Sequence, residues 1–234
     1  MTQINFHVRI SLLISALLIL TSCSGTSSNH LNSSATALTS VTDGTMIPNP
    51  YLPHQGTLVL NDPLVNNSHG YNWDDSTSSC QFSNHAYHVA TSLQLYTFWC
   101  AAYATHFSDF AYEAQMTIIK GDSGGLIFRA DAAKSKVYYF QIDQTGKYEF
   151  RAYTGHKSYA VLAEKTVSGF HEGVGQSNLV AVVAQGDHLT LYINHRFVKE
   201  VTNSTLSQGQ IGFGARDYGD PVEVVFTDAK VWKL

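Results

Sequence analysis

From about residue 85 onward, short apolar runs alternate with polar residues and end at turn-forming residues. The runs are rich in β-branched and aromatic side chains and recur at spacings of roughly 8 to 12 residues, separated by Gly, Asn, Asp and Ser. No stretch of a dozen residues places apolar side chains at helical spacing. The pattern therefore predicts an all-β sandwich or barrel rather than an α/β fold.

Turn residues between neighbouring runs predict three antiparallel hairpins. The first turn is DQTG at 143–146, the second is QGD at 185–187, and the third is the pair Asn194 and His195. Gly and Asn tolerate the backbone conformations that such tight turns require. The chain after residue 136 is thus expected to fold as a series of paired strands.

Alternation along each run separates a core face from a polar face that mixes aromatic rings, amides and charges. The polar positions chosen as a candidate binding face are Glu113, Gln115, Arg129, Tyr139 and Gln141. Aromatic rings can stack on a sugar ring while planar polar groups bond its hydroxyls. A carbohydrate-binding face is one interpretation, and a plain solvated face, normal for antiparallel sheets, is the other.

Charge narrows the choice of partner. The chain has 234 residues, a net charge of -4 and 14% charged residues, with no run of Lys or Arg. This composition argues against nucleic acid and favours a neutral ligand or another protein.

The first residues predict export. One positive charge at Arg9 precedes an apolar run, 10–20, that is shorter than the roughly 20 residues a membrane span needs. The sequence LTSC that ends at Cys23 resembles a bacterial lipobox, which implies diacylglycerol on the Cys23 thiol and cleavage of residues 1–22. An ordinary signal peptide with an incidental cysteine is the alternative. In the lipobox reading, the protein is anchored to the outer face of a bacterial cell membrane.

Residues 23–50 are dominated by Ser, Thr and Asn, so they cannot bury enough apolar surface to offset their chain entropy. They are expected to form a flexible tether, and residues 51–234 to form one β-sandwich domain. Cys80 and Cys100 remain as the only possible disulfide pair once Cys23 is lipidated. A disulfide is expected, with two buried free thiols as the alternative.

The string GDSGG at 121–125 is the one that surrounds the nucleophile of trypsin-like proteases. Such a protease needs a distant His and Asp, yet the nearest comparable upstream histidine, His106, is too close in sequence to span a barrel. The glycines are better explained by a turn and a strand that passes close to its neighbour. Ser123 is therefore not expected to be a nucleophile.

In order, the segments DFAYEAQMTIIKGDSGGLIFRAD, YYFQID, NLVAVVAQGDHLTLYINHRFVKEV, GQIGFGA and VEVVFTDAKVW resemble a concanavalin A-like lectin/glucanase domain. They are most similar to the branch named for 3-keto-disaccharide hydrolases, over roughly residues 105–234. The resemblance implies a jelly-roll of two curved antiparallel sheets whose concave face can hold saccharide. The chain departs from it at Tyr139, where hydrolase-like members often carry an acid, and it lacks an E-x-D-x-x-E strand of the glucanase type.

Three hypotheses about function follow. The first is a non-catalytic, lipid-anchored module that binds carbohydrate of a cell envelope or substrate polymer, with Tyr139 stacking on the sugar. The second is a glycoside hydrolase in which Glu113 and Glu149 act as the acid and base or nucleophile, which requires the two carboxyls to lie close together. The third is a spacer or protein-interaction domain without a small ligand.

Two further features are weaker. Asp62 and Asp228 fall near the first and last strands and could contribute to a structural calcium, although two carboxylates are too few to define a site. His85 and His88 are not spaced as ligands of a transition metal, and no cofactor is expected. Trp73 lies in a predicted loop, where it could be an aromatic platform or fold back onto the core.

Overall fold

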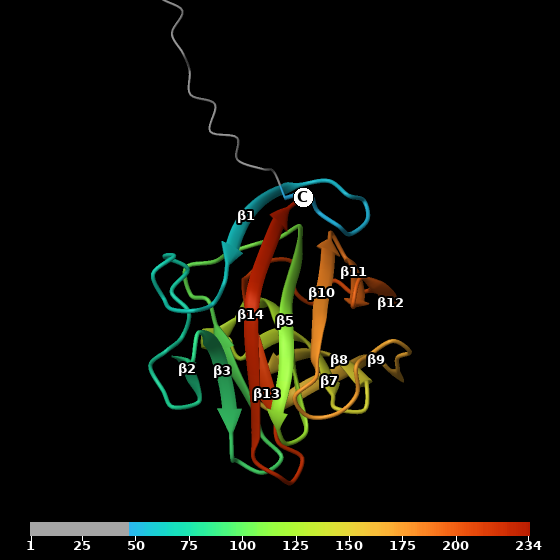
Figure 1. Ribbon diagram of the computed structural model, residues 1–234. Helices are drawn as coiled ribbons and strands as arrows, with labels where there is room; N and C mark the ends of the chain where they lie inside the picture. Colours follow the sequence, from blue (N-terminus) through green and yellow to red (C-terminus); the bar gives the residue numbers. More distant parts are fainter. Residues whose placement is uncertain (1–46) are drawn as a thin grey trace, which may run out of the picture. The chain divides into compact units, whose positions relative to one another are not determined.

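The computed structural model describes residues 47–234 (Figure 1). The predicted signal peptide, Cys23 and most of the predicted tether lie outside the described residues. Within the described part, no helix is long and apolar enough to cross a membrane. The strands are β1 (Thr57–Asp62), β2 (Cys80–Ser83), β3 (Ala86–Thr91), β4 (Thr97–Ala101), β5 (Phe110–Lys120), β6 (Ser123–Asp131), β7 (Lys136–Asp143), β8 (Lys147–Gly155), β9 (Ser158–Thr166), β10 (Ser177–Gln185), β11 (His188–Ile193), β12 (Arg196–Thr202), β13 (Gln210–Arg216) and β14 (Val222–Lys233), with one 3-10 turn, η1 (Ala132–Lys134).

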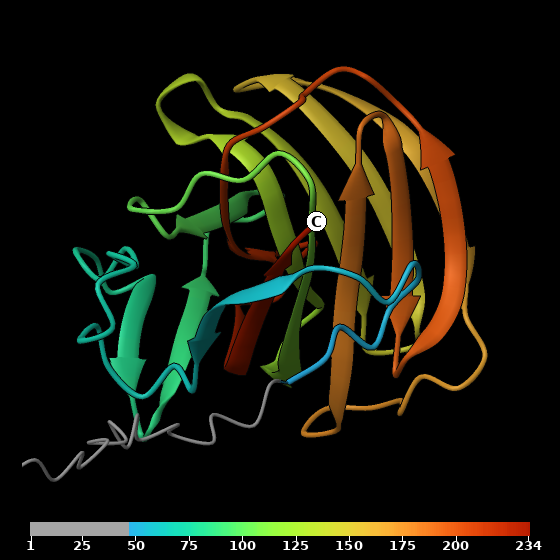
Figure 2. The same ribbon diagram turned by 90° about the horizontal axis from the view of Figure 1, so that it is seen from above.

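The strands form two antiparallel sheets, which confirms the predicted all-β sandwich. The eight-stranded sheet has the order β12-β11-β10-β5-β14-β3-β2, with β1 paired to the end of β14. The six-stranded sheet has the order β4-β13-β6-β7-β8-β9. Seen from above, strands β10 to β12 lie in one layer and the gold strands β8 and β9 in the other (Figure 2). Consecutive strands β5 and β6 belong to different sheets, so the chain crosses between the layers at residues 121–122.

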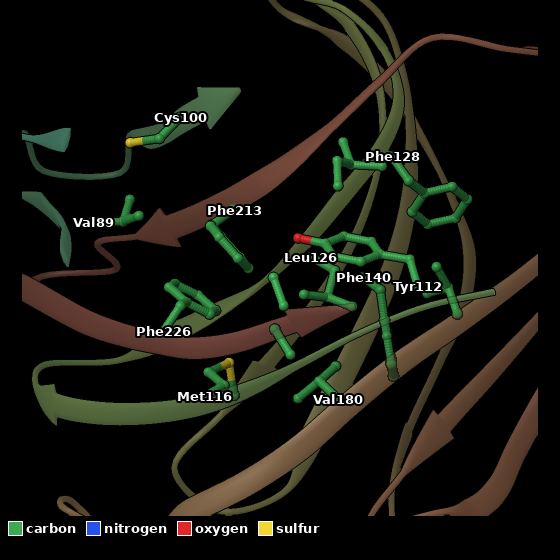
Figure 3. Close-up of a cluster of buried hydrophobic side chains, with 14 of the residues drawn as sticks. Val89, Cys100, Tyr112, Met116, Leu126, Phe128, Phe140, Val180, Phe213 and Phe226 are labelled. Carbon is green, nitrogen blue, oxygen red and sulfur yellow. The ribbon is translucent and has the colours of Figure 1, made fainter. Parts of the chain in front are cut away.

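The core fills the space between the sheets with aromatic and aliphatic side chains (Figure 3). Phe213 of β13 stacks on Phe226 of β14, with ring centroids 4.0 Å apart. Trp73 also belongs to this core, because it stacks on Phe213 at 5.1 Å and is 1% exposed. The alternative that Trp73 folds back onto the core is therefore the correct one.

A disulfide joins Cys80 of β2 to Cys100 of β4, with Cα atoms 5.8 Å apart, as predicted. Strand β2 is one edge of the eight-stranded sheet and β4 is one edge of the six-stranded sheet. The bond therefore links the two layers along one side of the sandwich. It reduces the conformational entropy of the unfolded chain and holds the edge strand β4 in place.

The three predicted hairpins are confirmed: β7 pairs with β8, β10 with β11, and β11 with β12. Asn194 and His195 take φ values of 50° and 60° in the last of these turns, as such a two-residue turn requires.

The glycines of GDSGG also have structural roles. A Cβ at Gly125 would lie 1.9 Å from the backbone oxygen of Phe140, so only glycine allows β6 to approach β7 this closely. The Ser123 hydroxyl is buried and donates to the Arg216 carbonyl at 3.3 Å.

Within the described residues, packing already includes Ile47, four residues before the boundary expected at residue 51. Trp232 Nε1 donates to the Ile47 carbonyl at 2.9 Å, and Asn49 is buried with its side chain bonded to the backbone of Tyr51 and Gln55. The segment 47–55 thereby lies on the outer face of the eight-stranded sheet. Tyr51 fills the small outer cluster there, against Tyr192 and Trp232.

Candidate functional site

The five residues of the predicted binding face do not share one face. Glu113 and Gln115 lie on β5, whereas Tyr139 and Gln141 lie on β7 in the opposite sheet. Alternation assigned these four side chains correctly to the side of their strands away from the core, but it carried no information about which sheet each strand joins. The predicted site is therefore divided between the two outer surfaces of the sandwich.

Glu113 is closed off by the chain itself. Tyr51 Oη donates to its carboxylate at 2.6 Å, and Lys230 Nζ lies 3.1 Å away. Burial, together with the Glu113 carboxylate, raises the pKa of the Tyr51 hydroxyl. Gln115, two residues along β5, accepts a hydrogen bond from Ser177 at 3.1 Å. Both residues are therefore part of the packed outer surface of the eight-stranded sheet.

The predicted pair of catalytic carboxylates is wrong. Glu149 lies on β8 and projects from the outer face of the six-stranded sheet, since its neighbours Tyr148 and Phe150 are in the core. Glu113 projects from the outer face of the other sheet. Two packed sheets are about 10 Å apart even before the side chains point away from each other, so these carboxyls cannot act on one glycosidic bond.

Arg129 was also placed on the wrong face, because β6 contains a bulge. The register between β6 and β7 shifts after Phe128, and Arg129 has a φ of 47°. The extra residue reverses the alternation and turns the guanidinium inward. Arg129 there donates to the carbonyls of Ser108 at 2.9 Å and Gly186 at 2.8 Å, and it ties together loops at one end of the sandwich.

The outer face of the six-stranded sheet is concave. Trp99 of β4 and Tyr153 of β8 touch edge to face, with ring centroids 4.9 Å apart, across the three intervening strands. In a flat sheet, four strand spacings of about 4.8 Å would separate these backbones by about 19 Å. The sheet must therefore curve toward this face, which we call the concave face.

Tyr139 lies on the concave face, yet its ring is 0% exposed. It lies against β13, where a Cβ on Gly214 would approach Tyr139 to 2.8 Å and Trp99 to 3.1 Å. Burial raises the pKa of the Tyr139 hydroxyl well above its ordinary value. The expectation that this ring stacks on a sugar is wrong for the observed arrangement, because the ring forms the floor under other aromatics.

Beside this floor, the concave face holds a pocket of about 300 Å³. We call it the aromatic pocket; it is lined by Leu95, Tyr96, Thr97, Trp99, Tyr153, His156, Lys157, Tyr159 and Arg216. Its walls come from the start of β4, the hairpin between β8 and β9, and the end of β13. The volume is at the lower limit for sites that bind small molecules.

A polar network borders the aromatic pocket. Arg151 Nε donates to Glu149 at 2.8 Å, Arg151 Nη1 donates to Tyr153 Oη at 3.2 Å, and Gln141 Nε2 donates to Tyr218 Oη at 2.5 Å. Burial opposes the charge on Arg151, but hydrogen bonds to Tyr153 and Glu149 outweigh it and raise its pKa. Partial burial is also the main reason why the pKa of the Tyr218 hydroxyl is raised. The network holds its side chains in fixed orientations beside the pocket.

The concave face carries unused hydrogen-bonding capacity. Within residues 47–234, four buried side-chain atoms lack a protein partner, and all four are on this face or its rim: Trp99 Nε1, Tyr139 Oη, Gln141 Oε1 and Arg216 Nε. Buried polar atoms are normally paired, so each needs an explanation such as a bound ligand or water. The clustering of these atoms makes the concave face the candidate functional site.

Residues 94–231, more than half of the chain, match the family described as the 3-keto-alpha-glucoside-1,2-lyase-like domain. The chain belongs to this family. The resemblance inferred from the motifs is thereby confirmed. The matched domain spans β4 through most of β14, and it includes every strand that lines the aromatic pocket.

Solved structures with the same fold include carbohydrate-binding and hydrolytic proteins. The carbohydrate binding module CBM66 from Bacillus subtilis has 21% identity and a TM-score of 0.60, over 69% of this chain and 96% of that chain. A Bacillus licheniformis beta-glucanase has 14% identity and a TM-score of 0.54, over 75% and 98% of the two chains. At these identities the likeness shows the concanavalin A-like jelly-roll fold alone. A comparison with curated proteins gave no match.

The sequence-based prediction missed most of the pocket. Trp99 and Tyr96 come from the opening part of the chain, where the resemblance to the family is less clear, and Arg216 ends the GQIGFGA strand, which indicated the fold and not a site. The available signal was the density of aromatic residues in LYTFW at 95–99 and YTGHKSY at 153–159. Nothing in the spacing of these two segments shows that they meet.

The predicted calcium pair is not supported by the geometry. The buried Asp62 carboxylate accepts hydrogen bonds from Trp73 Nε1 at 2.9 Å and Leu64 N at 2.8 Å. Asp228 lies at a bulge of β14 with a φ of 56° and is exposed. Within the described residues, no group of three or more His, Cys, Asp or Glu could hold a metal ion.

Proposed function

We propose that this protein binds carbohydrate in the aromatic pocket on the concave face, without chemical turnover. The observation that carries the proposal is the combination, in one pocket, of aromatic rings with Trp99 Nε1 and Arg216 Nε, two buried polar atoms that have no protein partner. Sugar rings offer both an apolar face for stacking and hydroxyls for these atoms. The shared fold with a carbohydrate binding module is consistent with this role.

Within the pocket, Tyr159 is the natural stacking surface. Its ring is 47% exposed, in contrast to the buried Tyr139 beneath the face. Arg151 lies over Tyr159 at 4.7 Å and Tyr153 contacts it at 5.0 Å, so the ring is held in one orientation before a ligand arrives. Preorganisation of this kind lowers the entropic cost of binding. Trp99 Nε1, which has no protein partner, then serves as a hydrogen-bond donor to a sugar hydroxyl.

The first experiment is a glycan panel probed with the purified protein for both binding and product release. Tyr159→Ala and Trp99→Ala are expected to weaken binding at least tenfold, which corresponds to about 1.4 kcal/mol. Tyr103→Ala is a matched control, because Tyr103 is also 47% exposed but does not line the pocket. Wild-type affinity in both pocket variants, or no glycan bound at all, would refute the proposal.

Product release is the outcome that favours the hydrolase alternative. Glu149 is the acidic residue of the polar network beside the pocket, so turnover lost in Glu149→Gln would assign catalysis to this face. Binding without product supports a module that only recognises its ligand. If neither binding nor product release is detected, the interaction-domain hypothesis is the one that remains.

We further propose that Cys23 carries a diacylglycerol anchor that holds the protein at the outer face of a bacterial cell membrane, with residues 23–50 acting mainly as a tether. The support is the sequence alone: a short apolar segment followed by LTSC. Radiolabelled fatty acid should be incorporated into the wild-type protein and not into Cys23→Ala. Equal labelling of both would exclude the anchor.

A further inference from the structure

The charge in the aromatic pocket is unbalanced. Its lining includes Arg216 and Lys157 but no carboxylate, although the whole chain has a net charge of -4. Low-dielectric walls strengthen the field of such charges at a binding site. The pocket is thus electrostatically different from the protein as a whole.

Arg216 is the central group of this imbalance. Its Nη1 donates to Thr97 Oγ1 at 2.8 Å and its guanidinium lies over the Tyr218 ring at 4.7 Å. Its Nε is buried without a partner. Over the described part of the chain, no carboxylate lies within ion-pair distance of Arg216.

The other two arginines of the six-stranded sheet are neutralised. Arg151 pairs with Glu149, and Arg129 lies 3.4 Å from Asp109 and also donates to backbone carbonyls. Arg216 alone among these three presents a fixed, stacked guanidinium to an open pocket. A planar guanidinium with free donors matches the two oxygens of a carboxylate, which it binds more strongly than a neutral hydroxyl.

We propose that the aromatic pocket selects an acidic sugar, a uronic acid residue, whose carboxylate pairs with Arg216 while its ring stacks on Tyr159. Lys157 on the adjacent hairpin adds a second, exposed positive charge. The inference rests on the proposed function and names its ligand class. A neutral sugar fills the same space but leaves the Arg216 charge unpaired.

The test uses matched ligands. Oligosaccharides of galacturonic, glucuronic and mannuronic acid are each compared with their carboxyl-reduced counterparts, which keep the ring and lose the charge. The wild-type protein is expected to bind at least one acidic form tenfold or more tightly than its reduced form. Raising the salt concentration should reduce this preference, because exposed Lys157 is screened.

Variants assign the preference to one residue. Arg216→Gln should abolish the preference for the acidic form over its reduced counterpart, and Lys157→Gln should lower that preference by a smaller factor. Arg196→Gln is the control, since Arg196 is exposed on β12 of the other sheet. Thermal unfolding checks that each variant is folded; the wild-type ligand comparison does not depend on any variant.

The outcomes separate the two proposals. Equal affinity for acidic and reduced forms would refute the acidic ligand and leave carbohydrate binding intact. If the protein binds neither form and no other glycan, both proposals are refuted. A preference that persists in Arg216→Gln would overturn the role assigned to that residue.

Discussion

Each outer face of the sandwich carries a tyrosine and a tryptophan, but the polar atoms of these residues are paired on one face and unpaired on the other. On the eight-stranded sheet, the Tyr51 hydroxyl donates to Glu113, and Trp232 Nε1 donates to the Ile47 carbonyl. On the six-stranded sheet, Tyr139 Oη and Trp99 Nε1 have no protein partner. The chain has closed the first face with its own segment 47–55 and has left the second face incomplete.

The contrast shows how one fold separates stability from recognition. A satisfied hydrogen bond to a buried group stabilises the fold, whereas an unpaired one costs roughly 1–3 kcal/mol until a ligand or water supplies its partner. A ligand that pairs with such a group removes this cost, so the unpaired group contributes to the free energy of binding. The same substitution should therefore have opposite effects on the two faces.

The largest expected effect is the loss of stability in Tyr51→Ala. Tyr51 is 2% exposed and packs against Tyr192 and Trp232, so removal of its ring should lower the free energy of unfolding by about 3–5 kcal/mol. Urea denaturation measures this change, with Tyr103→Ala as the exposed control. Glycan affinity of the folded protein should be unchanged. A loss below about 1 kcal/mol would mean that segment 47–55 contributes little to the fold.

A matched pair of smaller changes tests the contrast directly. Tyr51→Phe removes the hydroxyl that Glu113 accepts from, so it should lower the free energy of unfolding by about 1–3 kcal/mol. Tyr139→Phe removes an unpaired hydroxyl and should leave stability unchanged or raise it by about 1 kcal/mol. Both are measured by urea denaturation at neutral pH. Equal destabilisation by the two changes would contradict the distinction between the faces.

The smallest effect appears at alkaline pH. The pKa of Tyr139 is raised by burial, so the folded protein keeps this proton at a pH where the unfolded chain, with a pKa of about 10, has lost it. The free energy of unfolding should therefore fall as pH rises above about 10, by up to about 1.4 kcal/mol per pH unit for each such tyrosine. Below that pH, Tyr139 contributes no pH dependence.

Tyr139→Phe should make this decline shallower, because one titrating group is removed. Urea denaturation at pH 9 and pH 11 compares the two proteins. A decline of equal slope in both would show that Tyr139 ionises as easily in the folded state as in the unfolded chain.

The sequence predicted the strands and hairpins because these depend on local patterns, and it predicted the disulfide because only two cysteines remain besides Cys23. Period-two alternation placed Glu113, Gln141 and Glu149 correctly on the sides of their strands away from the core. It could not assign strands to sheets, since β5 and β6 are adjacent in sequence and lie in different layers. For this reason the residues of the predicted site turned out to lie on two different sheets.

The remaining errors arose from non-local packing. The bulge at Arg129 reversed one alternation, and curvature brought Trp99 and Tyr153 together from strands four positions apart in the sheet. Sheet curvature depends on how whole layers pack, and no single segment encodes it. Tyr139 illustrates the result: its face was predicted correctly, but its burial under other aromatic residues was not.

The hydrogen bond between Trp232 and Ile47 also determines how the domain can be oriented on a support. Leu234 packs against the same outer cluster as Tyr51, so both ends of the described domain lie on the eight-stranded sheet. A linker joined at either end therefore leaves from the side opposite the aromatic pocket. Proteins immobilised through such a linker on a sensor chip should display the pocket to the solution, without a redesign of the molecule.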